Sequence, residues 1–190
     1  MVESDHQAWK TPADERVIAY LDESVRSGRT AHSYLIGGPT GVGVQALAQE
    51  LAQALLCEAQ ERPCGRCRHC TRIAAKTHAD YSVLTPVGPS ATIGIDEIRE
   101  LKTASSLEPY EGRARVAVID GAEAMTPEAH NALLKLLEEP PNKVVIVMTT
   151  ADEGSIPETI RSRCQILRLR PLPFDRVEEA LVTDGVDRNA

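Results

Sequence analysis

The sequence predicts an α/β fold in which a parallel β-sheet is covered by helices on both faces. Short apolar runs alternate with segments in which apolar residues recur at helical spacing, a pattern typical of parallel strands joined by helical crossovers. A glycine-rich turn joins the first apolar run to the helix that follows it. Hydrophobic residues make up 42% of the 190 residues and charged residues 26%, which suits a soluble globular protein with a substantial core.

The first helix is expected to begin at Thr11-Pro12, where a hydroxyl N-cap precedes a proline in the first helical position. Gly28 is a plausible end for it. Residues 33–37 read SYLIG and predict a short buried strand, and the glycine-rich turn follows it. A second helix over residues 44–57 carries leucines at helical spacing.

Beyond a loop rich in cysteine, four more apolar runs predict strands, at residues 81–84, 115–119, 144–149 and 165–169. Helices are expected between them, one with Ile95, Ile98 and Leu101 on one face, and one that Thr126-Pro127 begins and Pro140-Pro141 ends. The composition changes near Pro171. We therefore expect one domain over residues 1–170, and in residues 171–190 a linker and the beginning of a second, helical domain.

The chain is acidic, with 21 Lys and Arg against 28 Asp and Glu, which gives a formal charge of −7. This charge argues against broad, non-specific binding to DNA phosphates, although it leaves room for a local basic patch or for DNA binding within an assembly. The first 16 residues contain no apolar run, and no stretch predicts a transmembrane helix. We expect a cytoplasmic protein without a membrane partner.

The turn after residues 33–37 has the spacing of a phosphate-binding loop but lacks its chemistry. Gly38 and Gly43 frame the expected pattern, with Gly41 between them. Val44 stands where a lysine would reach the β- and γ-phosphates, and Gln45 stands where a hydroxyl would ligate Mg²⁺. The backbone amides could still hold an anion weakly. On these residues alone, a simple strand-to-helix turn is an equally good interpretation.

A working ATP site also needs an apolar strand that ends in two acidic residues. Here the run of residues 116–119 ends in Asp120-Gly121, so the second acid is missing. Glu123 lies two residues further on and need not point the same way. Because the lysine, the hydroxyl and the second acid are all replaced, we expect neither ATP hydrolysis nor productive ATP binding.

Four cysteines predict a structural zinc site. They are spaced C-x6-C-x2-C-x2-C, and they are Cys57, Cys64, Cys67 and Cys70. C-x2-C turns place two thiolates on one ion, and four thiolates complete a closed tetrahedral shell without His69. The alternatives are free surface thiols, or a zinc finger that reads DNA, for which no recognition helix is evident.

The motif Ser162-Arg163-Cys164 directly precedes the last predicted strand. Cys164 has no base partner recognisable in the sequence, and a lone cysteine of this kind is most often buried filler. On its own, Arg163 would be interpreted as a surface arginine in an ordinary ion pair.

Taken together, these motifs resemble the AAA+ subunits of the bacterial DNA polymerase III clamp loader. The resemblance covers about residues 14–169 and rests on four features: the cysteine insertion, the lead into the glycine loop at residues 29–35 (RTAHSYL), the segment NALLKLLEEPP at residues 131–141, and the Ser-Arg-Cys motif. Within this family the altered residues Val44, Gln45 and Gly121, and residues 93–99 (IGIDEIR), look more like the delta-prime type than the gamma/tau type.

The resemblance implies an AAA+ domain over residues 1–170 with a zinc module at residues 57–70. It also implies a truncated start of the helical lid domain at residues 171–190, and a collar that this sequence lacks. Arg163, with Ser162 and Cys164 beside it, would serve as an arginine finger for the ATP site of a neighbouring subunit. The implied partners are the gamma/tau and delta subunits, and through the assembly the sliding clamp and primer-template DNA.

Two alternatives remain from the sequence. The chain could be an active gamma/tau-type ATPase or another P-loop NTPase, which Val44 argues against. It could also be a stand-alone, zinc-dependent nucleic-acid binder, which the acidic charge argues against.

Overall fold

The computed structural model of the chain describes residues 9–86 and 91–171. Its strands are β1 (Ser33–Gly37), β2 (Tyr81–Leu84), β3 (Arg115–Ile119), β4 (Val144–Thr150) and β5 (Gln165–Arg168). They form one five-stranded sheet in the order β2-β3-β4-β1-β5, and each neighbouring pair is parallel. All five strands were predicted from the sequence to within one residue at each end.

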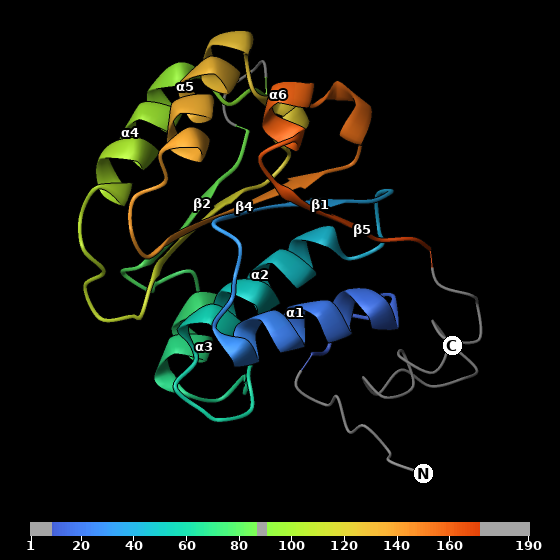
Figure 1. Cartoon of the computed structure of the whole chain (residues 1–190), viewed down its shortest axis with the longest axis vertical. Helices are drawn as coiled ribbons and strands as arrows, with labels where there is room; N and C mark the ends of the chain where they lie inside the picture. The colour runs from blue at the N-terminus through green and yellow to red at the C-terminus, as the bar shows by residue number, and fades with distance from the viewer. Residues whose placement is uncertain (1–8, 87–90, 172–190) are drawn as a thin grey trace.

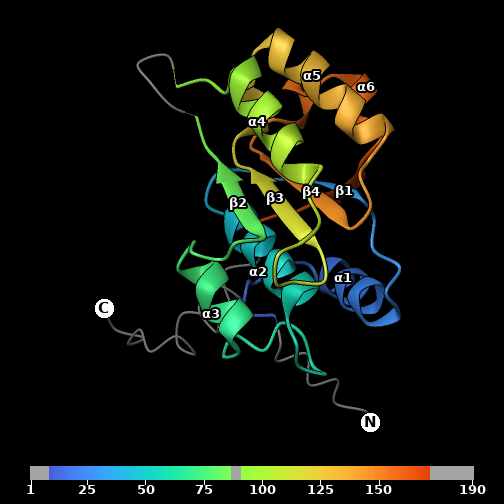
Figure 2. The same cartoon turned by 90° about the vertical axis from the view of Figure 1, so that its left-hand side faces the viewer.

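Helices cover both faces of this sheet, as the alternation of elements predicts. They are α1 (Glu15–Ser27), α2 (Val44–Leu56), α3 (Arg68–Ala74), α4 (Ile95–Ser105), α5 (Pro127–Glu138) and the short α6 (Glu158–Arg161). In Figure 1, α1, α2 and α3 lie below the sheet, and α4, α5 and α6 lie above it. The view in Figure 2 shows the same layers from the side. No helix among the described residues is long and apolar enough to cross a membrane.

β1 lies between β4 and β5 near the middle of the sheet, and all five of its residues are buried. Successive side chains of a strand point to opposite faces. Accordingly, Tyr34 and Ile36 pack into the core beneath the sheet with α1 and α2, whereas Leu35 packs into the core above it with α4 and α5. This is why a strand in such a place reads as a continuous apolar run.

α1 begins three residues later than the sequence predicts. Its N-cap is Asp14, whose carboxylate accepts a hydrogen bond from the Arg16 N–H at 2.9 Å. The Thr11 hydroxyl caps nothing and has no hydrogen-bond partner among the described residues, while the Thr11 N–H donates to the buried carboxylate of Glu50 on α2, at 3.0 Å. Thr11 is thus held against α2, outside α1, although its local sequence is a good start signal. The expected end at Gly28 is confirmed, in a left-handed conformation.

α5 begins and ends as its sequence predicts. The Thr126 hydroxyl accepts a hydrogen bond from the Ala129 N–H at 3.2 Å, and Pro127 is the first helical residue. α3 and α6 were not predicted. Both are short, and both lie next to motifs, the cysteine spacing and Ser-Arg-Cys, that were interpreted for their chemistry rather than for secondary structure. The expected linker and lid start lie almost wholly outside the described residues, which end at 171.

A buried carboxylate fixes the chain between α4 and β3. Asp80 is completely buried, and its two oxygens accept hydrogen bonds from the backbone N–H groups of Tyr110, Glu111 and Gly112, at 2.6 to 2.8 Å. Burial acts to raise the pKa of Asp80, but these three donors and the nearby Arg115 guanidinium hold it below the ordinary value of 3.8. The carboxylate is therefore ionised and bound in the folded protein.

We predict that Asp80→Asn lowers the free energy of unfolding by about 2–4 kcal/mol at pH 7, because an amide removes the charge and cannot accept all three bonds. Urea denaturation measures this value. Since folding lowers the pKa of Asp80, its contribution is complete well above pH 3.8 and declines as the pH falls below 3.8 toward the folded-state pKa.

The matched control is Asp96→Asn, since Asp96 is an exposed aspartate that pairs with Arg99 on the same helix turn. Its loss should change the unfolding free energy by less than about 0.5 kcal/mol. Equal effects of the two substitutions would contradict the assignment to Asp80.

Candidate functional site

The glycine loop between β1 and α2 has the backbone of a phosphate-binding turn. Gly41 and Gly43 both adopt left-handed conformations, with φ values of 90° and 88°. A Cβ at Gly38 would lie 2.9 Å from the Leu169 carbonyl oxygen, so no side chain fits there without movement. The three glycines are therefore required by the conformation of the loop and by its close packing.

Val44 and Gln45, which stand in the places of the lysine and the hydroxyl of a working loop, lie in different environments. Val44 is the first residue of α2 and is 4% exposed, packed in the core beneath the sheet. Gln45 is exposed. Thr11 lies against the loop, with its Cγ2 atom 3.0 Å from where a Cβ of Gly43 would be. What remains for an anion is the partial positive charge of the α2 amino end.

Asp120 lies at the carboxyl end of β3, which is separated from β1 by β4. Its carboxylate accepts a hydrogen bond from the Thr149 hydroxyl on β4 at 2.6 Å, and that hydroxyl in turn accepts one from the Gly121 N–H at 3.1 Å. Glu123 is turned elsewhere and accepts a hydrogen bond from the Ala151 N–H. The structure thus brings Asp120 to the same sheet edge as the loop, and Thr149 is a member of this group that the sequence analysis missed.

Arg163 lies at the opposite edge of the sheet. It precedes β5, and its carbonyl accepts a hydrogen bond from the Ser33 hydroxyl at the first residue of β1, at 2.7 Å. The glycine loop leaves the other end of β1. At roughly 3.3 Å per residue, the five residues of β1 separate the two edges by about 16 Å. The structure therefore does not bring Arg163 to the loop of its own chain.

The neighbours of Arg163 hold the end of α6. The Ser162 hydroxyl donates to the Thr159 carbonyl, and the Cys164 thiol donates to the Ile160 carbonyl at 3.2 Å. Burial raises the pKa of Cys164 to about 11, so the thiol stays protonated near neutral pH and is a poor nucleophile. It packs against the core above the sheet but is only half-buried, so the interpretation of a lone cysteine as buried filler holds in part.

The four clustered cysteines, at residues 57–70, form what we call the cysteine module. Their sulfur atoms all lie within 4.8 Å of one another, with 3.9 Å between Cys57 and Cys67 and 4.0 Å between Cys64 and Cys70. Zn–S bonds of about 2.3 Å give tetrahedral S–S edges of about 3.8 Å, whereas a disulfide requires about 2.05 Å. The four thiols therefore fit a metal ion such as zinc and form no disulfide.

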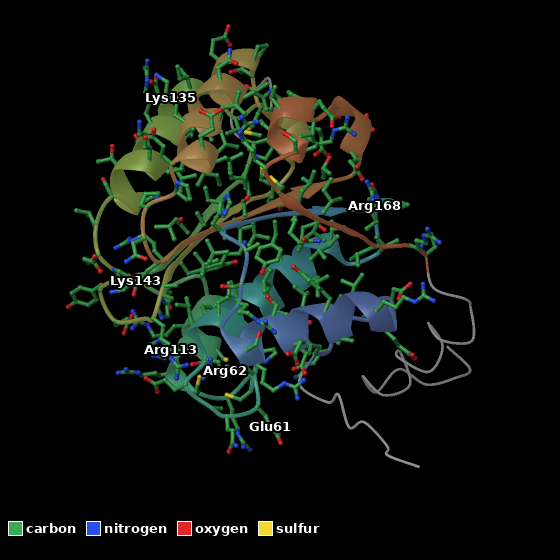
Figure 3. All side chains as sticks on the ribbon, in the orientation of Figure 1. Glu61, Arg62, Arg113, Lys135, Lys143 and Arg168 are labelled. Carbon is green, nitrogen blue, oxygen red and sulfur yellow. The ribbon has the colours of Figure 1, made fainter. Side chains whose placement is uncertain are left out.

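The module is attached firmly to the domain. Cys57 and Cys70 are fully buried, and the Gln53 side chain of α2 donates to the Cys70 carbonyl at 2.9 Å. Burial raises the pKa of Cys57 and Cys70. Burial acts to raise the pKa of Cys67 too, but backbone N–H groups and the neighbouring thiols lower it to about 6, so Cys67 ionises before those two thiols. Figure 3 shows Arg62 and Arg113 on this side of the molecule, away from Arg168.

A second group of possible ligands, His69, His78 and Glu111, adjoins the module, but its hydrogen bonds argue against a second metal. The Asp80 N–H donates to Nδ1 of His78 at 3.0 Å. In the neutral ring Nε2 must then carry the proton, and it lies 2.6 Å from Nδ1 of His69. A metal would need that nitrogen deprotonated.

These bonds form a continuous chain instead. The Nε2 atom of His69 lies 2.9 Å from the Glu58 carboxylate, so each ring donates to the next acceptor. Burial lowers the pKa of His78, which keeps its ring neutral near pH 7. The chain ties α3, which carries Cys70, to the start of β2. Neither His78 nor Glu58 could be predicted from the sequence as part of this chain, because nothing in their spacing connects them.

We predict about one equivalent of zinc per chain in protein purified without added metal, because four thiolates complete its shell. Cys70→Ser should lower the metal content several-fold, whereas Cys164→Ser, the matched control outside the module, should leave it unchanged. Elemental analysis by mass spectrometry measures both. Metal-free protein in which all four thiols of the cysteine module can be titrated, with unchanged folding, would contradict the site.

The chain matches known proteins over most of its length. Residues 13–173 match the family described as "DNA polymerase III, delta subunit". A Pseudomonas aeruginosa protein, "DNA polymerase III subunit delta'", is 40% identical over 145 residues, which are 75% of this chain and 44% of that protein. An Escherichia coli protein, "DNA polymerase III subunit tau", is 33% identical over 169 residues, 88% of this chain and 26% of that protein.

A solved structure shows the same fold. It is a DNA polymerase III gamma subunit-related protein from Thermotoga maritima, with a TM-score of 0.61, 24% identity, and coverage of 89% of this chain and 51% of that one. The chain spans less than half of the length of the curated relatives named above. The parallel sheet, the four-cysteine cluster and these matches together confirm the fold class and the resemblance drawn from the sequence. The chain belongs to the delta-prime clamp-loader subunit family of DNA polymerase III.

Proposed function

We propose that this chain acts in a clamp loader as a delta-prime-type subunit that does not hydrolyse ATP, and that Arg163 completes the ATP site of a neighbouring subunit. Its partners are gamma/tau and delta subunits, and through them the sliding clamp and primer-template DNA in the cytoplasm. In this proposal residues 1–170 are its AAA+ domain, and residues 171–190 are the linker and the start of the lid.

The observation that carries this proposal is the separation of Arg163 from its own glycine loop. The two lie at opposite edges of the sheet, with the length of β1 between them. A guanidinium at the amino ends of the strands cannot reach a phosphate bound at the carboxyl ends of the strands in the same domain. It is free to reach a phosphate held by another subunit, where it would stabilise the negative charge of phosphoryl transfer.

The loop itself supports a non-hydrolysing role. Val44 contributes buried apolar surface to the core rather than a cation to the loop. The missing lysine removes a charge-assisted contact, which is about twice as strong as a neutral hydrogen bond. Gly121 offers no carboxylate beside Asp120, and Glu123 is engaged by the Ala151 N–H. Among the residues that the structure describes, neither Gly121 nor Glu123 therefore offers a free carboxylate beside Asp120 to activate a water molecule.

An active gamma/tau-type ATPase, or another P-loop NTPase, is the second candidate. It is favoured by the left-handed glycines of the loop and by Asp120, which lies where a residue that orients Mg²⁺ would be needed. The tau relative at 33% identity shows that similarity of sequence alone does not separate the two types. A nucleotide titration separates them.

We predict no ATPase activity and little or no ATP affinity for the isolated chain, because three of the groups that bind or activate ATP·Mg²⁺ are replaced. Titration with fluorescent ATP and Mg²⁺ measures the affinity. Micromolar, Mg²⁺-dependent binding would favour the gamma/tau type instead. Binding of inorganic phosphate alone would decide nothing, since any helix amino end can hold an anion.

We predict that Arg163→Ala, in the full-length protein assembled with its partners, lowers ATP turnover stimulated by clamp and DNA. Arginine fingers are worth about 10³ to 10⁵ in rate in other NTPases, but the effect here should be smaller because other sites keep their own arginines. Arg163→Lys should rescue little, because lysine lacks the planar fork of donors. Steady-state turnover and clamp loading are the measurements.

The matched control is Arg168→Ala, since Arg168 is also an exposed arginine paired with a glutamate, Glu153. It should leave turnover unchanged. If the Arg163→Ala complex assembles and loads clamps at the normal rate, Arg163 is an ordinary surface residue. Failure to assemble would assign it a structural role in the interface.

A further inference from the structure

The Arg163 side chain is held by two elements of its own domain. Its Nη2 atom donates to the Glu138 carboxylate, the last residue of α5, at 2.8 Å. Its Nη1 atom donates to the Thr159 carbonyl in α6 at 2.7 Å, and lies 3.4 Å from the Ser162 hydroxyl. The guanidinium is therefore held from two directions, although 36% of the side chain is exposed.

This arrangement leaves part of the guanidinium free for a ligand. A guanidinium has five N–H donors, and three of them are used by these partners. The other two have no partner among the described residues. A fixed plane with two free donors at a surface suits the planar, two-pronged recognition of a phosphate from another molecule.

We infer that Glu138 is a positioning residue, which orients the guanidinium of Arg163 toward the nucleotide of the neighbouring subunit. The inference rests on the proposed function of Arg163. A free arginine side chain loses about 2 kcal/mol of rotamer entropy when it is fixed. Glu138 fixes it before the neighbour binds, so that less of this loss opposes the transition state.

The location of Glu138 is itself unfavourable for helix stability. A carboxylate in the last turn of a helix faces the negative end of the helix dipole. The following residue, Glu139, is also exposed; its backbone N–H donates to the Lys135 carbonyl, but its carboxylate forms no ion pair among the described residues. An ion pair as exposed as that between Glu138 and Arg163 contributes little to the free energy of folding. Orientation of the arginine therefore explains this contact better than fold stability does.

The test uses the full-length protein in the assembled clamp loader. Glu138→Ala should lower the kcat of clamp- and DNA-stimulated ATP turnover about three- to tenfold, with the KM for ATP unchanged, because misplacing a catalytic group affects the transition state more than binding. Glu138→Gln keeps an acceptor oxygen without the charge, so its kcat should lie between those of the unchanged protein and of Glu138→Ala. Glu139→Ala, the adjacent matched control, should leave kcat unchanged.

A double substitution separates positioning from a general structural effect. In the Arg163→Ala background, Glu138→Ala should cause no further loss, because the residue that it positions is gone. Additive losses would overturn the inference, and so would a rise in turnover on Glu138→Ala, which would mean that Glu138 restrains the arginine. If Arg163→Ala lowers turnover but Glu138→Ala and Glu138→Gln do not, the inference alone fails. If Arg163→Ala has no effect, the proposed function fails with it.

Discussion

The parallel pairing of β1 with β4 on one side and β5 on the other is the constraint on which the rest of the structure depends. Because these strands run in one direction, everything that follows a strand gathers at one edge and everything that precedes a strand gathers at the other. The glycine loop and Asp120 follow strands, whereas Arg163 precedes one. The sheet thus places the glycine loop with Asp120 and the Ser-Arg-Cys motif at opposite ends of its strands.

Under the proposed function, this division lets a domain whose own loop binds no ATP act at the ATP site of a neighbour. Val44, which stands in the place of the lysine, lies only at the carboxyl ends of the strands. The amino edge keeps its own supports, which come from Ser33, Glu138 and Thr159 and involve no residue of the loop. The two edges can therefore change independently, and one can lose its chemistry while the other keeps its geometry.

The strands could be predicted from the sequence because each is a short apolar run bounded by turn residues. The cysteine cluster could be predicted because the spacing of its cysteines is typical of metal ligands. The prediction failed where a contact with a residue far away in the sequence determines the local structure. The local sequence at Thr11 predicts a helix cap, but in the structure the Thr11 N–H donates to Glu50, 39 residues away, and the Thr11 hydroxyl caps no helix. The contact of Glu138 with Arg163 spans 25 residues, and the pair of His69 and His78 depends on how α3 meets β2. No local pattern announces such contacts.

The central claim is that Arg163 acts on a nucleotide bound by another subunit while its own loop binds none. The most direct measurement is a structure of the assembled clamp loader with ADP, Mg²⁺ and a fluoride mimic of the transferred phosphoryl group. The account predicts a guanidinium N–H of Arg163 about 3 Å from the mimic in the neighbouring site, and no nucleotide at the Gly38–Gly43 loop. A nucleotide with Mg²⁺ on that loop, or Arg163 turned away from the neighbouring site, would contradict it.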